Sequence, residues 1–212
     1  MNNVIKILSM NKDYRVAIAD TKKIAERELA GFTGEIAVRD FLAQFITNCA
    51  LLSGINDFSS KISVSLRLSE EASAFCLITG QTLSLEYSGT LNLYRKNLSD
   101  LFDCKSIMTV TTGDWQTGLH TGTVEAYIDN IDMLFSHFAM QSDQLSSQFI
   151  IAKKDRSRGI LFQPLPFAEH DTMQKASQEL AYLSEKLEQA DWEDVPALYA
   201  HLGKVVSQSK IE

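Results

Sequence analysis

The chain has 212 residues, of which 45% are hydrophobic and 22% charged, and its net charge is −7. These values are typical of a folded globular protein and exclude a disordered chain. The acidic balance argues against nucleic-acid binding through a basic patch, the N-terminus lacks the pattern of a signal peptide, and no apolar run reaches the roughly 18 residues of a membrane span. We therefore expect a soluble cytoplasmic protein.

The first third of the chain predicts a hairpin followed by two helices. Residues 4–20 form the hairpin, with 11–13 as its turn. Thr21 is placed to cap a helix over 22–30. A longer helix over 37–52 is predicted to pack flat against a sheet, because its apolar residues recur with the 3.6-residue period of one wide stripe: Val38, Phe41, Leu42, Phe45, Ile46, Cys49 and Leu52.

The middle of the chain predicts a series of short strands. Apolar residues at 62, 64, 66 and 68 alternate with polar ones, which is typical of an antiparallel sheet with one solvated face. The pattern continues over 74–78, 83–87, 91–93, 107–111 and 121–127. Asn130 is a good cap for a helix over 131–141.

Two more strands are predicted over 148–153 and 159–163. The basic run from Lys153 to Arg158 is interpreted as the solvated turn between them. Pro164 and Pro166 then end the sheet.

The composition changes after Pro166, and residues 169–212 are predicted to be all helical. An apolar residue recurs there at alternating spacings of three and four, the pattern of a narrow seam: Met173, Ala176, Leu180, Leu183 and Leu187. A second short helix is expected near Asp194. The predicted fold is α+β, with a mainly antiparallel body and packed helices over 1–168 and a helical, linker-like tail over 169–212.

No motif for catalysis or metal binding is present. Cys49, Cys76 and Cys104 each stand alone, as reduced thiols do, and the first two lie in apolar stretches where buried packing is expected. The four histidines form no zinc-binding pair. The sequence thus predicts neither an enzyme nor a cofactor.

Two stretches resemble the heat-shock protein 33 family. In the first, the helix over 131–138 runs into Ser142-Asp143-Gln144, where the family has Ser-Glu-Gln. The second, from Gly159 through Gln163 to Leu165-Pro166, is similar to the end of the family's β core. The order of elements over residues 3–168 also fits, and the helices after Pro166 match the family's linker in position and type.

The sequence departs from the family in three places. The family carries a histidine after its first helix, which Gly31-Phe32-Thr33 lacks. Residues 69–74 lack the family's glycine-rich turn, and no Cys-x-Cys or Cys-x-x-Cys pair follows residue 168. The family's zinc module would begin about where the sequence stops. Either the protein ends there or the sequence is part of a longer chain.

The resemblance implies an ATP-independent holdase, a chaperone that binds unfolded or misfolded client proteins and forms a homodimer. In the family, zinc-bound cysteines keep the linker folded over the body until oxidation releases it. Here we expect no zinc, and activity that is constitutive or controlled by the tail alone. Client binding should use an exposed apolar patch. Four residues are candidates either for that patch or for docking the tail on the sheet: Met173, Leu180, Leu183 and Leu187.

The alternative is a non-chaperone interaction module or partner subunit that kept the fold and lost holdase activity. The departure at residues 69–74 favours this second hypothesis modestly. Suppression of client aggregation, with and without reductant, discriminates between the two.

Overall fold

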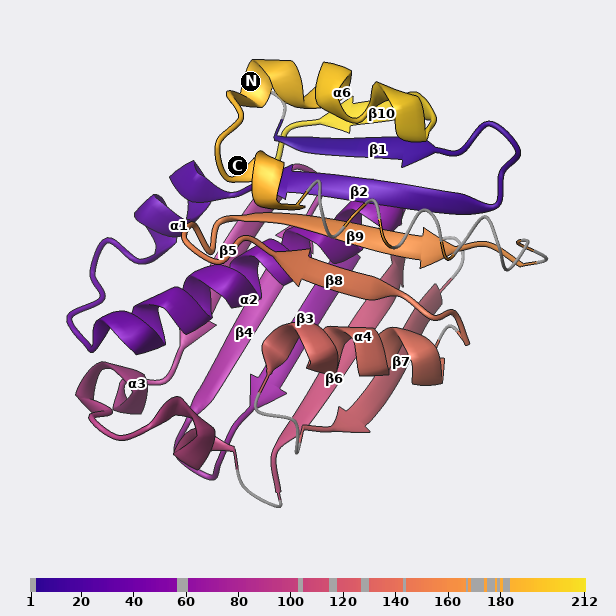
Figure 1. Cartoon of the computed structure of the whole chain (residues 1–212). Helices are drawn as coiled ribbons and strands as arrows, with labels where there is room; N and C mark the ends of the chain where they lie inside the picture. The colour runs from indigo at the N-terminus through magenta and orange to yellow at the C-terminus, as the bar shows by residue number, and fades with distance from the viewer. Residues whose placement is uncertain are drawn as a thin grey trace.

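The computed structural model consists of two five-stranded antiparallel sheets with helices between them (Figure 1). Sheet A has the strand order β10-β1-β2-β9-β8, and sheet B the order β5-β4-β3-β6-β7. This confirms the predicted α+β class. The described residues are 3–56, 61–102, 105–114, 118–126, 130–142, 144–166, 168, 174, 178, 180 and 184–212.

Sheet A joins the two ends of the chain. The predicted hairpin is confirmed as β1 (Val4–Leu8) and β2 (Tyr14–Asp20), and the later pair as β8 (Gln148–Ile151) and β9 (Arg158–Pro164). β2 pairs with β9 along its whole length, so that segments more than 130 residues apart lie side by side. The basic run between β8 and β9 forms the turn that was predicted.

The tail contributes the fifth strand of sheet A, so the prediction of an all-helical tail was wrong. Residues 184–187 are helical, and short helical turns follow as η2 (Trp192–Asp194), α6 (Val195–Leu198) and η3 (Ala200–Leu202). β10 (Lys204–Ser209) then pairs with β1. The adjacent β-branched residues Val205 and Val206 suit a strand, and the open edge of β1 supplies the hydrogen-bond partners.

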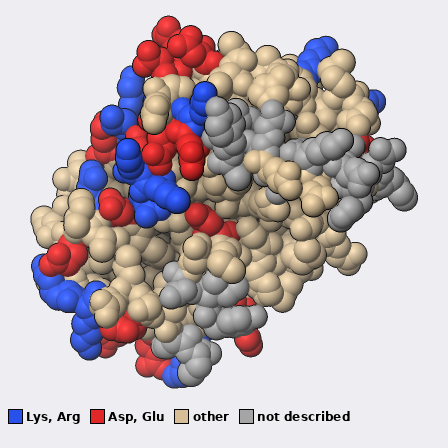
Figure 2. Space-filling view, in the orientation of Figure 1, with Lys and Arg blue, Asp and Glu red and all other residues tan. Residues whose placement is uncertain are grey.

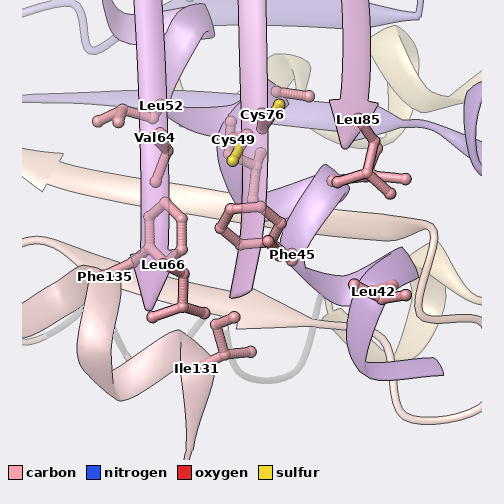
Figure 3. Packing of buried hydrophobic residues seen from close by; sticks show 14 of the residues in the cluster. Leu42, Phe45, Cys49, Leu52, Val64, Leu66, Cys76, Leu85, Ile131 and Phe135 are labelled. Carbon is pink, nitrogen blue, oxygen red and sulfur yellow. The ribbon is translucent and has the colours of Figure 1, made fainter. Parts of the chain in front are cut away.

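The long helix α2 (Ile36–Ile55) lies between the two sheets. It approaches sheet A closely because small residues face it: a Cβ added at Gly54 would lie 2.9 Å from the Cβ of Ala17. On its other side it packs against β3, β4 and β5, as Figure 3 shows for Phe45, Cys49 and Cys76.

The burial of α2 extends around the helix, beyond the single apolar stripe that was predicted. Polar residues inside it bond to the helix itself: the Thr47 hydroxyl donates to the Ala43 carbonyl at 2.9 Å, and that of Ser53 to the Ala50 carbonyl at 2.7 Å. By length and composition α2 could cross a membrane, but 72% of its most apolar window is buried inside the protein. It is the central core helix.

Sheet B confirms the predicted alternation. Its strands are β3 (Lys61–Arg67), β4 (Ser73–Thr79), β5 (Thr82–Tyr87), β6 (Ile107–Asp114) and β7 (Gly118–Glu125). One face packs on α2 and on α4 (Ile131–Ser142), and the other carries mostly Ser and Thr. The strand predicted at 91–93 was wrong, because these residues belong to the short helix α3 (Thr90–Leu93), with η1 (Leu98–Leu101) after it.

The predicted caps have different outcomes. Asn130 caps α4, since its Oδ1 accepts hydrogen bonds from the backbone N–H groups of Asp132 and Met133 at 3.0 and 3.2 Å. Thr21 does not cap α1 (Lys22–Glu28) with its side chain. Its hydroxyl instead donates to the Ser157 carbonyl at 3.0 Å, which ties the end of β2 to the β8–β9 turn.

Candidate functional site

The outer face of sheet A, turned away from α2, is a continuous apolar surface. Its side chains come from β1, β2 and β9, where they alternate with the smaller residues that face α2. All are at most 8% exposed. They are Ile5, Ile7, Tyr14, Val16, Ile18, Ile160 and Phe162.

The tail covers this face. One apolar cluster contains both the sheet residues and buried side chains of the tail, namely Leu180, Leu187, Val195, Tyr199 and Leu202. Burial raises the pKa of Tyr199, so its phenol is neutral at physiological pH. This face is therefore not exposed, because the tail shields it from water, and the expected exposed apolar patch stays a prediction.

The four predicted surface residues divide into two pairs. Leu180 and Leu187 are 0% and 1% exposed and contact the outer face of sheet A. Met173 and Leu183 lie outside the described residues. The described pair thus has a tail-docking position, while contact with a client stays a prediction.

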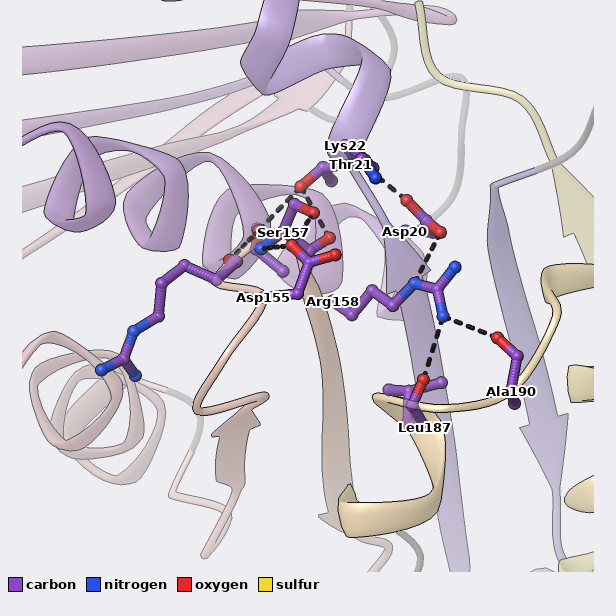
Figure 4. A network of polar contacts seen from close by, with 10 residues as sticks. Asp20, Thr21, Lys22, Asp155, Ser157, Arg158, Leu187 and Ala190 are labelled. Carbon is purple, nitrogen blue, oxygen red and sulfur yellow. Dashed lines mark hydrogen bonds and ion pairs between the residues drawn. The ribbon is translucent and has the colours of Figure 1, made fainter. Parts of the chain in front are cut away.

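Arg158 links the body to the tail (Figure 4). Its Nε donates to Oδ2 of Asp20 at 2.8 Å, and the two residues face each other on β9 and β2. One terminal nitrogen of the same guanidinium donates to the carbonyls of Leu187 at 3.1 Å and Ala190 at 2.7 Å. These carbonyls lie at the end of a helical segment of the tail, where backbone acceptors lack partners within the helix.

Two further hydrogen bonds hold the tail on the sheet. The Tyr14 hydroxyl donates to the Leu202 carbonyl at 2.9 Å, and the backbone N–H of Lys154 donates to Oε1 of Glu188 at 3.0 Å. The ring of Tyr14 also packs on Phe162, with 5.2 Å between the ring centroids. The tail is therefore anchored at several points along its described length.

The second family motif has a structural role in this chain. Gly159 allows close packing, because a Cβ there would lie 2.4 Å from Cδ1 of Ile151. Gln163 is fully buried and joins two polar groups: its Oε1 accepts from Nε of Arg15 at 2.6 Å, and its Nε2 donates to the Ser147 hydroxyl at 2.9 Å. Both residues thus stabilise the body.

The remaining motif residues lie at the ends of elements. Ser142 is the exposed last residue of α4, and Gln144 adopts a positive φ of 56° in the connection to β8. The backbone N–H of Leu165 donates to the Asp13 carbonyl at 2.7 Å, and Pro166 is exposed. Asp143 lies outside the described residues.

The described cysteines do not fit a zinc site. Cys49 and Cys76 are free, buried neighbours in the core, and burial, followed by the contact with Cys76, raises the pKa of the Cys49 thiol. Zinc in a structural site takes four N or S ligands, and no group of three His, Cys, Asp or Glu side chains converges among the described residues. Cys104 lies outside that part of the chain.

Sequence reasoning missed Asp20 and Arg158 as partners. Arg158 was treated as one charge of a solvated turn, yet its side chain is only 16% exposed and that of Asp20 15%. Their pairing depends on β2 lying beside β9, which no local pattern reveals. Opposite charges at the ends of two predicted strands were the available signal.

Comparison with known proteins agrees with this arrangement. The model of the Hsp33 protein family matches residues 2–209. The crystal structure of the 33 kDa chaperonin (heat shock protein 33 homolog) from Thermotoga maritima superposes with a TM-score of 0.77 and 14% identity, covering 100% of this chain and 80% of that one. A search of curated proteins finds no match. Because the family model spans nearly the whole sequence, the chain belongs to the Hsp33 family.

Proposed function

We propose that the chain is an ATP-independent holdase whose client-binding surface is the outer face of sheet A. The observation that carries the proposal is the continuous apolar surface on β1, β2 and β9 that the tail buries. Unfolded clients expose apolar side chains, and burying them is favourable by roughly 25 cal/mol per Å². Membership of the Hsp33 family supports a chaperone.

In this proposal the tail regulates client binding, because it covers the outer face of sheet A. The large apolar residues that are exposed elsewhere on the described surface are dispersed over several elements: Met10, Ile36, Leu93, Leu119, Met133, Met140 and Val206. Single exposed apolar residues are normal on a soluble surface. Of the two modes expected from the sequence, control by the tail is therefore favoured over constitutive activity, because the outer face of sheet A becomes accessible when the tail moves away.

The proposed control does not use zinc or thiol oxidation. The buried positions of Cys49 and Cys76 support this view, since a buried thiol with a raised pKa is a poor nucleophile. Heat is the natural trigger in its place, because a segment packed on the outside of a sheet can open locally before the body unfolds. A homodimer and a cytoplasmic location are further parts of the proposal.

Light scattering of a thermally unfolded enzyme tests the activity. The full chain, equimolar with the client and without ATP, should suppress scattering equally in reductant and in peroxide. Suppression only after peroxide would contradict the absence of a thiol switch. Suppression in neither condition, even at temperatures where the tail opens, would favour the interaction module instead.

Hydrogen exchange locates the surface. When the client is added, exchange of residues 184–202 should increase because the tail leaves the sheet, while β3 and β4 in sheet B keep their protection. Unchanged exchange of the tail in a protein that does suppress aggregation would show that clients bind elsewhere.

A further inference from the structure

A cavity of about 510 Å³ lies where the tail and the last residues of the chain meet the start of α1. It is lined by Asn3, Lys22 and Lys23 from the body and by Trp192 and Lys210 from the tail. Its size falls within the roughly 300–1,000 Å³ of typical small-molecule sites. The cavity adjoins the covered apolar face of sheet A, because Trp192 of its wall also packs against that apolar cluster. The proposed holdase activity gives the cavity itself no role.

The cavity is basic, although the chain as a whole is acidic. Its wall contains four cationic side chains, Lys22, Lys23, Arg27 and Lys210, while the whole protein has a net charge of −7. Arg27 is paired with Glu28 at 2.7 Å, so the positive charge available to a ligand comes mainly from Lys22 and Lys23. Figure 2 shows Lys and Arg side chains intermixed with Asp and Glu over the upper left of the molecule, so the positive charge here is local to the cavity.

The two acidic residues of the wall are already paired. Asp20 accepts from Arg158, and Glu212 forms an ion pair with Lys210. Lys22 and Lys23 are exposed, and neither has an ion-pair partner among the described side chains. An excess of positive charge therefore remains at the mouth of the cavity, where it attracts anions.

The rest of the wall is apolar and includes an aromatic ring. Trp192 is half-buried, and Ile24 and Ile211 are 2% and 3% exposed. An indole beside a group of cations suits a ligand with a flat, uncharged part and a multiply charged part, because bases stack on aromatic side chains and phosphates bind lysine ammonium groups.

We propose that this cavity binds a nucleotide, with its phosphates against Lys22 and Lys23 and its base against Trp192. Two adjacent lysines without an ion-pair partner in the described part of the chain favour a di- or triphosphate over a singly charged carboxylate. The ligand is an effector that is bound intact, and no bond is made or broken.

Because the cavity lies between the body and the tail, a bound nucleotide would affect the position of the tail. Since Trp192 belongs to the covering part of the tail and Lys22 and Lys23 belong to the body, the ligand binds the docked arrangement better than the open one and shifts the population towards it. This regulatory part rests on the proposed function, in which the tail covers the client surface. The binding of the nucleotide to the cavity does not depend on the proposed function.

Tryptophan fluorescence tests the binding directly. The chain has two tryptophans, so Trp115→Phe leaves Trp192 as the sole indole. Titration with ATP should quench its emission saturably, tripolyphosphate should bind more weakly, and adenosine more weakly still. Lys22→Gln/Lys23→Gln, made in this background, should weaken ATP binding by about tenfold or more, because two attractive charges are lost.

A matched double variant is the control. Lys61→Gln/Lys96→Gln removes the same charge from exposed positions outside the cavity wall and should leave the ATP titration unchanged. Calorimetric titration of the unsubstituted chain provides the same comparison if Trp115→Phe does not fold. The absence of saturable ATP binding, equal losses in both double variants, or tripolyphosphate binding as tightly as ATP would each overturn the nucleotide site. None of these results depends on chaperone activity.

Discussion

The guanidinium of Arg158 forms an ion pair with Asp20 at 2.8 Å and donates two more hydrogen bonds to carbonyls of the tail. One side chain of the body thus stabilises both the edge of a strand pair and the docked position of the cover. Bonds from a charged donor contribute more than neutral ones, and their partners here are mostly shielded from water.

Arg158→Ala should release the tail. The loss of about 2 kcal/mol raises the population of the open tail by on the order of 30-fold. Hydrogen exchange and limited proteolysis of residues 184–202 should increase, and suppression of client aggregation should begin at a lower temperature. Arg95→Ala is a matched control, because Arg95 also has one acidic partner, Glu35 at 3.2 Å, and donates to two carbonyls, yet lies on an exposed loop. If both variants behave alike, Arg158 has no specific role in holding the tail.

Asp132→Asn should stabilise the protein at neutral pH. Burial raises the pKa of Asp132 above its ordinary 3.8, although hydrogen bonds from Gln44 and Asn48, each at 2.8 Å, act in the opposite direction. Folding therefore favours the protonated carboxyl: its contribution is complete below pH 3.8 and is lost as pH rises through the raised value.

Thermal melts over a range of pH check this sign. The variant should melt above the wild type at neutral pH, and the difference should shrink as the pH falls from the raised pKa towards 3.8. The asparagine oxygen can still accept from Gln44 and Asn48. A variant that is less stable at neutral pH would show that the charged carboxylate is favoured by the fold.

Gly159→Ala should destabilise the body. The added methyl would lie 2.4 Å from Cδ1 of Ile151 and 3.1 Å from Cδ1 of Leu51. Overpacking of this kind costs about 1–3 kcal/mol, and each kcal/mol lowers the Tm by roughly 2–4 °C in a domain of this size. Gly89→Ala is the control, since Gly89 has helical angles and no atom within 4 Å of the added Cβ. Equal melting temperatures for the two variants would contradict close packing at Gly159.

Cys49 and Cys76 should resist thiol reagents in the native protein. Both are at most 1% exposed, and the raised pKa of Cys49 keeps its thiol protonated. The titre with a disulfide reagent should rise by at least two thiols per chain when urea unfolds the protein. Rapid labelling of both residues under native conditions would show that the core opens readily. It would also contradict the proposal that thiol oxidation does not control the activity.

The sequence predicted the parts of the fold that depend on local pattern. Alternation gave the strands of sheet B, and the 3.6-residue period gave α2. It did not predict that α2 lies between two sheets, because the hydrophobic period does not say how many partners a helix has. It also missed β10, whose strand conformation depends on the free edge of β1, about 200 residues away in the chain.

The candidate site could be predicted only in part. The apolar period of the tail selected Leu180 and Leu187, which do contact the sheet. The apolar face itself was not recognised, because Val16, Ile18 and Ile160 looked like ordinary strand residues. Both faces of sheet A are buried, one by α2 and one by the tail. Strands buried on both faces lack the alternation of apolar and polar residues, so the sequence does not distinguish one face from the other.

The pairing of β10 with β1 changes how the cover can move. The part of the chain between β9 and β10 is attached to sheet A at both ends, by the strand before it and the strand after it. Such a segment can leave the apolar surface while its two attachments stay in the sheet, and its return is an intramolecular step that needs no search for a partner. Under the proposed function, a client that leaves the surface would be replaced by the chain's own residues.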